Sequence, residues 1–348
     1  MKLFVCRGAV DCATSLFLFV GESASFLFLS FTSIVILQFF EILFRNMIEK
    51  PTLSWYNYNV KSAKEELAVA KNKLVAPVVK WVGGKRQLLD EISSLLPKKI
   101  TSYCEPFVGG GAVLLFIQPS KAIVNDLNSD LIAVYETIRD DVDTLIEMLK
   151  THENNAEYFY TIRDMDRDRE TYLLMSKVEK ASRLIYLNKT CFNGLFRVNS
   201  SGEFNSPFGH YKNPNIVNEP ILRAVSKYFN SGNILFYSED FADTLARVHK
   251  GCFVYLDPPY DPVSDTASFT GYNKGGFDKN EQIRLKQCCD DLTKRGIKFL
   301  LSNSATDFIK ELYKDYDITI VKAKRVINAD ATKRGAIEEV LIRNYGVE

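Results

Sequence analysis

A short turn of acidic, proline and aromatic residues has the groups needed to bind an amine. It consists of Asp257, Pro258, Pro259 and Tyr260, and it follows the apolar residues 252–256. Two consecutive prolines fix φ and remove two N–H donors, so the turn presents carbonyl acceptors. The Asp257 carboxylate and the Pro258 carbonyl can each accept one N–H of a planar amine, which directs the nitrogen lone pair toward an electrophile, and Tyr260 offers a stacking face. A rigid surface turn is the alternative interpretation.

Glycines follow a second strand-like run. Residues 102–107 lead into Gly109, Gly110 and Gly111, and Asp126 follows the next apolar run. A strand, a glycine turn and a helix let the backbone approach a ligand closely, and an acid after the next strand can hold ribose hydroxyls. The spacing differs from G-x-G-x-x-G, so the motif favours a nucleotide-like ligand over a nicotinamide cofactor. The alternative is an ordinary strand–helix turn.

Residues 80–86 read Lys-Trp-Val-Gly-Gly-Lys-Arg and form a glycine turn before a predicted helix. Trp81 can lie against a cation and Lys85 can reach a carboxylate, while the start of the helix favours anionic groups. The alternative is a tryptophan buried beside an ordinary turn.

Residues 188–212 interleave amides, basic residues and aromatic residues with glycines. This composition suits a nucleic-acid reader, because arginine can bind guanine with two hydrogen bonds and an aromatic ring can fill the gap left by a displaced base. A structural hairpin is the alternative.

The basic residues of 322–334 are a further candidate for phosphate binding, or else a solvated face.

The turns that carry this chemistry lie between segments with strand and helix patterns. Strands are expected at residues 102–107, 121–124, 233–237, 252–256 and 298–301, with a late pair at 317–322 and 338–343. Helices are expected at residues 85–96, 112–117, 130–148, 158–169, 219–230, 279–295 and 305–313. Strands alternating with helices predict an α/β fold with a mainly parallel sheet and a ligand site beyond the strands' carboxyl ends. Residues 181–214 break the alternation and predict an inserted module with a hairpin.

The composition is that of a folded globular protein of 348 residues, with two domains or one domain and a large insertion. The 44 Lys and Arg nearly balance the 43 Asp and Glu, so a polyanion would have to bind at a local cluster of basic residues. The seven cysteines form no C-x-x-C pair and there are three histidines, so no metal site is expected. Scattered cysteines suit a reducing compartment.

The first 46 residues differ from the rest, since they hold nine of the 24 phenylalanines. The uncharged stretch between Glu22 and Glu41 approaches the roughly 20 apolar residues of a membrane span. It does not resemble a signal peptide. Three interpretations are open: a mis-assigned start, with Met47 as the natural first residue; a membrane anchor formed by residues 23–44; or a buried apolar hairpin.

In this order and spacing, the motifs resemble those of the Dam-type DNA adenine methyltransferases, the D12 class within the α group of amino-methyltransferases. The resemblance runs from about Val79 to the C-terminus and joins five blocks: K-W-x-G-G-K, E-P-F-V-G-G-G, N-D-L-N-S-D-L, N-K-T-C-F-N-G-L-F-R and D-P-P-Y. It implies a Rossmann-like methyltransferase fold with an inserted, mainly helical target-recognition domain that carries a β-hairpin. It also implies methyl transfer from S-adenosyl-L-methionine to N6 of a flipped adenine in duplex DNA, without a metal.

Carried over position by position, the resemblance implies three sets of site residues. The catalytic set is Asp257, Pro258, Pro259 and Tyr260. The set expected to bind the methyl donor is Trp81, Lys85, Glu105, Phe107, Gly109, Gly111, Asp126 and Asp257. The set expected to bind DNA is Lys80, Lys189, Phe192, Asn193, Gly194, Leu195, Arg197, Pro207 and His210. In this set Phe192 and Asn193 would take the intercalating position, while Leu195 and Arg197 would read bases.

The 188–212 block is most similar to the branch of the family that recognises GATC. It departs from that branch at position 210, which is His instead of the usual Arg, and at position 192, which is Phe where Tyr is common. GATC or a related short site is therefore expected. The expected partners are double-stranded DNA and, functionally, a cognate restriction endonuclease. The expected location is the cytoplasm at the nucleoid, with membrane contact only if residues 23–44 are a genuine span.

The resemblance also implies a domain organisation. Residues 1–46 are an apolar extension and 47–75 a linker, while 76–143 and 233–348 form the catalytic domain around a target-recognition domain at 144–232.

Three other functions remain open: a cytosine-N4 methyltransferase, which usually has Ser where Asp257 stands; a catalytically inactive DNA-binding module; and a nucleotide-dependent oxidoreductase.

Overall fold

The computed structural model describes residues 14–15, 30–31, 71–263, 276–324 and 336–346. The chain divides into two units, Met1–Ala70 and Lys71–Glu348. In the first, β1 (Thr14–Ser15) pairs antiparallel with β2 (Ser30–Phe31). The other expectations for residues 1–46, including the membrane span at 23–44, fall outside the described residues. Within the described part of the chain, no helix has the length and apolar character needed to cross a bilayer.

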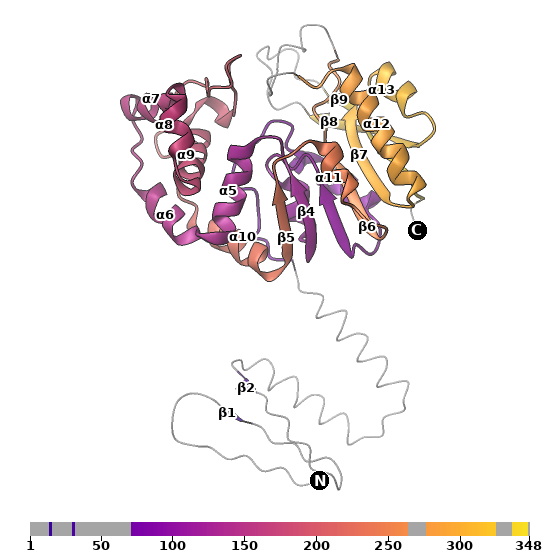
Figure 1. The fold of residues 1–348 in the computed structure, drawn as a ribbon, viewed down its shortest axis with the longest axis horizontal. Helices are drawn as coiled ribbons and strands as arrows, with labels where there is room; N and C mark the ends of the chain where they lie inside the picture. The colour runs from indigo at the N-terminus through magenta and orange to yellow at the C-terminus, as the bar shows by residue number, and fades with distance from the viewer. Residues whose placement is uncertain (1–13, 16–29, 32–70, 264–275, 325–335, 347–348) are drawn as a thin grey trace. The chain divides into compact units, whose positions relative to one another are not determined.

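The second unit is built on a seven-stranded sheet (Figure 1) with the strand order β5-β4-β3-β6-β7-β9-β8. The strands are β3 (Ser102–Glu105), β4 (Lys121–Asn125), β5 (Asn233–Tyr237), β6 (Cys252–Leu256), β7 (Lys298–Ser304), β8 (Asp317–Lys324) and β9 (Ala336–Arg343). Neighbours from β5 to β7 run parallel, whereas β9 runs antiparallel between β7 and β8. The predicted mainly parallel α/β sheet and the pairing of the two late strands are confirmed, and this pair is antiparallel. Of the two late strands, β8 is at an edge of the sheet, whereas β9 lies inside it.

Strand order reverses between β3 and β6, which are parallel neighbours although about 150 residues separate them. From β3 the chain continues to β4 and β5 on one side, and from β6 to β7 on the other. A ligand site in an open parallel sheet lies beyond the carboxyl ends of the strands at such a reversal. The glycine turn follows β3 and the diproline turn follows β6, so the fold brings the two motifs together at this point.

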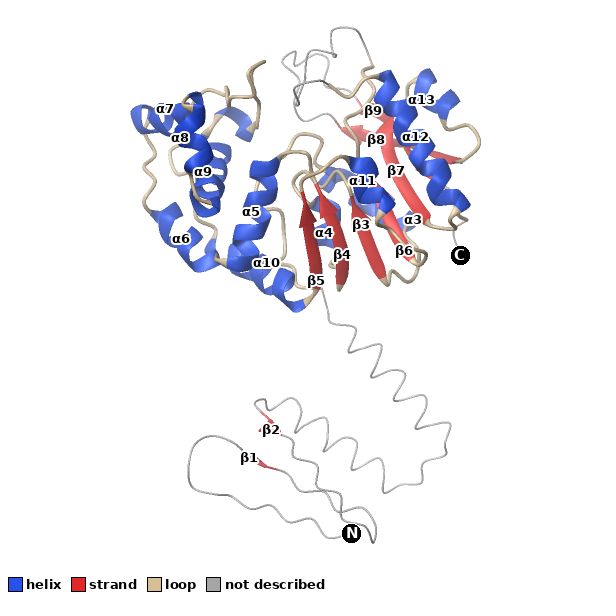
Figure 2. Cartoon of the chain, in the orientation of Figure 1, coloured by secondary structure: helices blue, strands red, loops and turns tan. Residues whose placement is uncertain are grey.

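Helices cover both faces of the sheet (Figure 2). One face carries α3 (Leu89–Leu95), α4 (Ala112–Ile117), α5 (Ser129–Asp140) and α10 (Glu219–Ser231), and the other carries α11 (Phe241–Ala246), α12 (Lys279–Lys294) and α13 (Asp307–Leu312). Strand side chains alternate between the two cores: Tyr103 and Tyr255 pack on the α5 side, whereas Cys104 and Val254 pack on the α12 side. This alternation is the expected consequence of the two-residue period of a strand.

A group of helices stands beside the β5 edge of the sheet (Figure 1). It comprises α6 (Val142–Lys150), α7 (Ala156–Asp164), the 3₁₀ turn η2 (Met165–Arg167), α8 (Arg169–Leu174) and α9 (Lys177–Thr190). A capping box between Ser176 and Glu179 starts α9. Helix α9 joins two cores, because Leu184 packs with the sheet-side core and Tyr186 with a separate core that includes Phe204. The domain boundaries at residues 144 and 232 stay predictions.

Two sequence expectations in this region were wrong. The helix expected at 130–148 is two helices, because Asp141 has an extended φ of −149° and caps α6 by accepting the Thr144 N–H. The hairpin module expected at 181–214 begins with ten residues of helix α9, whose apolar side chains are buried in the two cores. A hairpin does follow this helix: around the antiparallel bridge of Val198 with Phe204, the Asn199 N–H donates to the Glu203 carbonyl and the Asn205 N–H to the Arg197 carbonyl, both at 2.9 Å. A second bridge pairs Cys191 with Phe208.

The Asn125 side chain joins the turns after three neighbouring strands. Its amide nitrogen donates to the carbonyls of Pro106 and Glu239, both at 3.0 Å, and its oxygen accepts the Glu239 N–H at 2.9 Å. Asn125 is fully buried. One amide therefore satisfies three backbone groups that would otherwise be buried without partners.

We predict that Asn125→Ala lowers the free energy of unfolding by about 3 kcal/mol, since each orphaned buried group costs roughly 1–3 kcal/mol. Urea denaturation followed by circular dichroism measures the change. The control is Asn280→Ala on the exposed face of α12, for which we expect a change within about 0.5 kcal/mol. Equal changes in the two variants would contradict the role given to the Asn125 amide.

Candidate active site

The glycine turn after β3 has a backbone shape that demands glycine. Gly109 and Gly111 have φ values of 47° and 69°, in the left-handed region. Space is also limiting, because a Cβ on Gly109 would lie 2.8 Å from Cδ1 of Trp81. The Tyr135 hydroxyl donates to the Gly109 carbonyl at 2.6 Å, and Asp126 Oδ2 accepts the Gly109 N–H at 3.0 Å. Trp81 and Asp126, both expected near the donor, thus lie on this turn.

The diproline turn holds an ion pair at its first residue. Asp257 Oδ1 lies 2.7 Å from Lys85 Nζ and accepts the Ser302 hydroxyl at 2.9 Å. Lys85 is 6% exposed and its ammonium lies 4.7 Å from the centre of the Tyr260 ring. The ammonium also donates to the Gly83 carbonyl. A positively charged amino group therefore already lies between the Asp257 carboxylate and the face of Tyr260.

Acceptors remain available at this turn. The Asp257 side chain is 19% exposed, and its Oδ2 accepts no hydrogen bond from the described residues. Within the same described set, no donor reaches the Pro258 carbonyl. The Pro259 carbonyl differs, since it accepts Nε2 of Gln282 at 2.9 Å. The turn thus offers the two acceptors that the sequence predicted, and α12 holds the Pro259 carbonyl in place.

Several residues that support the diproline turn gave no signal in the sequence. They come from β7, α12 and β9, and all act through contacts between distant segments: Gln282, Ser302, Asn303 and Glu339. Asn303 accepts the Asp261 N–H at 3.0 Å and donates to Gln282 at 3.1 Å. These bonds fix the chain on both sides of the two prolines.

Three carboxyl groups line this end of the sheet, and burial raises the pKa of each. Burial, reinforced by Asp257, raises the pKa of Glu105 to about 8 against the hydrogen bond from Tyr103. Burial likewise raises the pKa of Asp126 and of Asp257, although backbone N–H groups in one case and Lys85 in the other oppose the change. A concentration of buried acids fits a positively charged ligand, because a cation would stabilise their ionised forms.

Aromatic rings lie on the far side of the glycine turn. Phe107 packs at 5.3 Å from Phe241 and at 5.8 Å, edge to face, from Phe277. Phe241 is the first residue of α11, the helix after β5, and no sequence motif included it. Together the glycines, rings and acids fit a ligand with a flat apolar part and a positive charge. No group of His, Cys, Asp and Glu among the described residues could hold a metal ion.

The segment of residues 191–210, here called the reader segment, lies beyond α9. It opens with the 3₁₀ turn η3 (Phe192–Gly194), in which Asn193 has φ 58°. The Phe192 side chain is 53% exposed, and its N–H donates to the Pro207 carbonyl at 2.8 Å. A large apolar side chain held at the surface by a fixed backbone suits insertion between bases.

The Asn188 amide connects the reader segment to the first motif. It accepts the Lys80 N–H at 2.8 Å and donates to the Lys80 carbonyl at 2.7 Å and to the Gly194 carbonyl at 3.1 Å. Gly194 has φ 65°, and a Cβ there would lie 2.6 Å from Cδ of Lys80. The backbones of Lys80 and Gly194 are thus locked together although 114 positions separate them.

Polar and basic groups of the expected DNA-binding set lie at or near the surface. Arg197 is exposed and its Nε donates to Oδ1 of Asn205 at 2.7 Å, which orients the guanidinium. Burial, together with Lys80 and Arg86, lowers the pKa of Lys189 to about 8, which shows that the three cations lie close to one another. His210 is exposed, with φ 53° and its ring 4.8 Å from Phe208. Leu195 is half-buried.

Comparison with known proteins identifies the chain's relatives. Residues 81–327 match the family model of the D12 class N6 adenine-specific DNA methyltransferase. A Type II methyltransferase, M1.LlaDCHI of Lactococcus lactis subsp. cremoris, is 44% identical over 79% of this chain and 98% of its own length. M.MjaIII of Methanocaldococcus jannaschii is 43% identical over 78% of this chain and 99% of its own length. The DNA adenine methylase of Escherichia coli K12 is 36% identical over 76% of this chain and 93% of its own length. The chain therefore belongs to the D12 class of N6 adenine-specific DNA methyltransferases.

Proposed function

We propose that the diproline turn binds the N6 amino group of the target adenine, and that the reader segment recognises GATC or a related short site. The observation that carries the first assignment is the position of Lys85. Its ammonium lies 2.7 Å from the Asp257 carboxylate and over the Tyr260 ring. A site that already holds one amino group in this way can hold another, once the lysine moves aside.

In this proposal Asp257 Oδ2 and the Pro258 carbonyl accept the two N–H groups of adenine N6. The negative charge of the carboxylate and the dipole of the carbonyl stabilise the positive charge that develops on the nitrogen. The base must leave the duplex to reach the turn, at a cost of a few kcal/mol. Stacking on Tyr260 and insertion of Phe192 into the vacated position offset that cost.

The family implies S-adenosyl-L-methionine as the methyl donor, and the residues beyond β3 and β4 fit it. The donor supplies a methyl group on a positively charged sulfur, which is already electrophilic. The glycine turn allows close approach, Phe107 and Phe241 offer apolar rings, and the carboxyls of Glu105 and Asp126 suit a cation. These residues would hold the donor with its methyl group facing the diproline turn.

For the target site, the reader segment retains most of the residues expected for GATC. Arg197 is oriented by Asn205, as a base-reading arginine needs to be. His210 is shorter than the arginine usual in that branch, so its contact to guanine or phosphate is weaker. Identity is higher to the two Type II methyltransferases, at 44% and 43%, than to the E. coli DNA adenine methylase, at 36%. We therefore propose pairing with an endonuclease of the same site, acting at the nucleoid.

We predict that Asp257→Asn lowers the rate of methyl transfer about 10²–10³-fold, because it removes the charge that stabilises the developing cation. Asn is preferred to Ala, which would also remove the acceptor facing Ser302. Single-turnover methylation of cognate duplex measures the rate, and thermal unfolding checks the fold. Asp307→Asn, at a fully exposed acid on α13, is the control. Near-normal turnover of Asp257→Asn would refute the assignment of the turn.

A second prediction concerns pH. The pKa of Glu105 is about 8, so its carboxyl is protonated at neutral pH in the free protein. A bound cation lowers that pKa, so binding releases a proton and the donor's affinity rises with pH until about 8. Calorimetry between pH 6.5 and 8.5 measures this slope, which Glu105→Gln should flatten. S-adenosylhomocysteine, which lacks the sulfonium charge, should show a smaller slope. The same slope in the Gln variant would exclude Glu105 from the donor site.

A third prediction concerns the recognition sequence. Full-length protein expressed in a methylation-free host should modify adenine in GATC, as read by sequencing with modified-base detection. We expect Arg197→Ala to reduce discrimination against one altered base pair by about 10–100-fold, corresponding to the loss of one bidentate base contact. Donor affinity should stay within about twofold. Modification of an unrelated sequence would refute GATC, and unchanged discrimination would remove Arg197 from the reading residues.

A further inference from the structure

The reader segment has little regular structure of its own. The sheet-like pairings recorded in this fully described stretch are the two isolated bridges, Cys191 with Phe208 and Val198 with Phe204. A two-stranded ribbon of this size is marginal in water. Its orientation must therefore come from the residues on which it is docked.

Two neighbouring charged residues hold the backbone of Phe204. Asp166 Oδ2 accepts the Phe204 N–H at 2.7 Å, and Arg167 Nη2 donates to the Phe204 carbonyl at 2.7 Å. A carboxylate and a guanidinium thus make the two hydrogen bonds that a neighbouring strand would make to the Phe204 backbone. Bonds of this charge-assisted kind are shorter and stronger than those between neutral groups.

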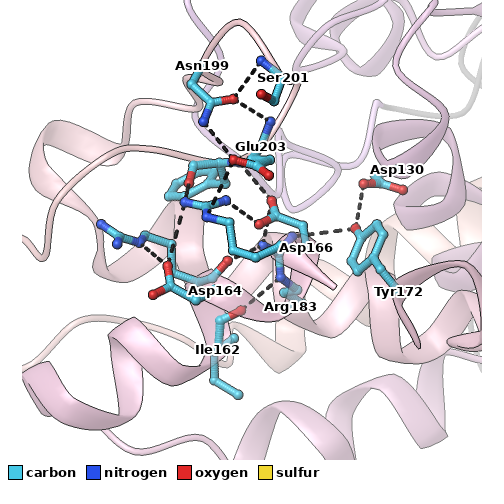
Figure 3. Close-up of polar contacts among 12 residues, drawn as sticks. Asp130, Ile162, Asp164, Asp166, Tyr172, Arg183, Asn199, Ser201 and Glu203 are labelled. Atoms are coloured by element: carbon cyan, nitrogen blue, oxygen red, sulfur yellow. Dashed lines mark hydrogen bonds and ion pairs between the residues drawn. The ribbon is translucent and has the colours of Figure 1, made fainter. Parts of the chain in front are cut away.

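The Asp166 carboxylate is itself fixed in a buried network (Figure 3). Arg183 Nη2 lies 2.8 Å from Asp166 Oδ2, and the two side chains are 6% and 9% exposed. Arg183 also donates to the carbonyls of Ile162 at 2.9 Å and Arg163 at 2.6 Å. Its guanidinium is therefore tied to the end of α7, and the carboxylate that holds Phe204 cannot rotate freely.

The same network reaches the helix that follows Asp126. Arg183 Nη1 lies 3.4 Å from the Tyr172 hydroxyl, which donates to Asp130 Oδ2 at 2.6 Å (Figure 3). Asp130 lies in the first turn of α5. The support of the reader segment is thus connected, through side chains alone, to the element that begins beside the glycine turn.

A stack of aromatic rings makes a second connection. The Phe204 ring packs edge to face on Phe196 at 5.7 Å, and Phe196 stacks on Trp81 at 4.8 Å with 21° between the planes. Trp81 in turn lies against Gly109. Phe196 directly precedes Arg197, so the position of Phe204 sets where this arginine stands relative to the glycine turn.

We propose that Asp166 is a positioning residue for target-site discrimination, which acts through Phe204 and Phe196 on Arg197. With Asp166 in place, the segment can present Arg197 in one position only, and a wrong base pair leaves its hydrogen bonds unmade. Without it, the segment shifts and accommodates wrong sites more readily. The inference rests on the DNA-reading role proposed above for residues 191–210.

The test is Asp166→Ala in the full-length protein. The readout is the ratio of kcat/KM on cognate duplex to that on a duplex with one altered base pair, which a merely structural loss of active protein would leave unchanged. We expect the ratio to fall at least about tenfold. Affinity for S-adenosylhomocysteine without DNA should stay within about twofold. Asp166→Asn keeps an acceptor for the Phe204 N–H and should restore part of the ratio.

Asp164→Ala is the matched control. This neighbouring acid is 48% exposed and pairs with Arg163 and Arg167, but it makes no recorded bond to the reader segment. Its ratio should equal that of the unaltered protein. An equal fall in both variants would overturn the proposal. It would show that weakening the ion pairs of Arg163 and Arg167 lowers the ratio even when the hydrogen bond from Phe204 to Asp166 is kept.

If Asp166→Ala fails to fold, Phe196→Leu replaces it, since this change breaks the stack on Trp81 and leaves every charge in place. We expect the same fall in the ratio, and an unchanged ratio in Phe196→Leu or in folded Asp166→Ala overturns the proposal. Arg197→Ala is measured in parallel. If that variant also keeps the ratio, the reading role of the segment is wrong; if it alone lowers the ratio, only the role of Asp166 is wrong.

Discussion

Strands β3 and β6 are hydrogen-bonded parallel neighbours from which the chain departs in opposite directions across the sheet. Their carboxyl ends therefore open side by side, and the residues that follow them must meet. The glycine turn approaches from one strand and the diproline turn from the other. Lys85 contacts Asp257 across this junction at 2.7 Å. A methyl donor on the glycine turn and an amine on the diproline turn would be held facing each other by the sheet itself, without a further structural element to align them.

The electrostatics of this junction follow from burial. Burial raises the pKa of Glu105, Asp126 and Asp257, and Lys85 forms an ion pair with Asp257. The ionised forms of these acids are unfavourable without a nearby positive charge and are stabilised when a cation binds. Lys85 stabilises the Asp257 carboxylate through Oδ1 in the ligand-free protein. In the proposed function, the amino group of the base binds at Oδ2 of the same carboxylate.

The sequence predicted those parts of the fold that depend on local pattern. Strands β5 and β6 have the expected bounds, because each is a short apolar run between turn residues. Helix α9 was missed, since its buried face includes polar residues such as Asn188 and Arg183 that resemble a loop composition. The contacts of Asn188 and Ser302 gave no signal because their partners, Lys80 and Asp257, lie 108 and 45 positions away. Contacts of this kind exist only once the chain has folded.

In the role proposed for the reader segment, specificity and fold depend on different side chains. Phe192 and Arg197 are exposed, so their replacement should change the proposed contacts to DNA with little change in the free energy of unfolding. Asp166 and Arg183 are buried and paired, so loss of Asp166 would leave Arg183 as an uncompensated charge in the interior. The buried support and the exposed residues of this part of the chain can therefore be altered separately.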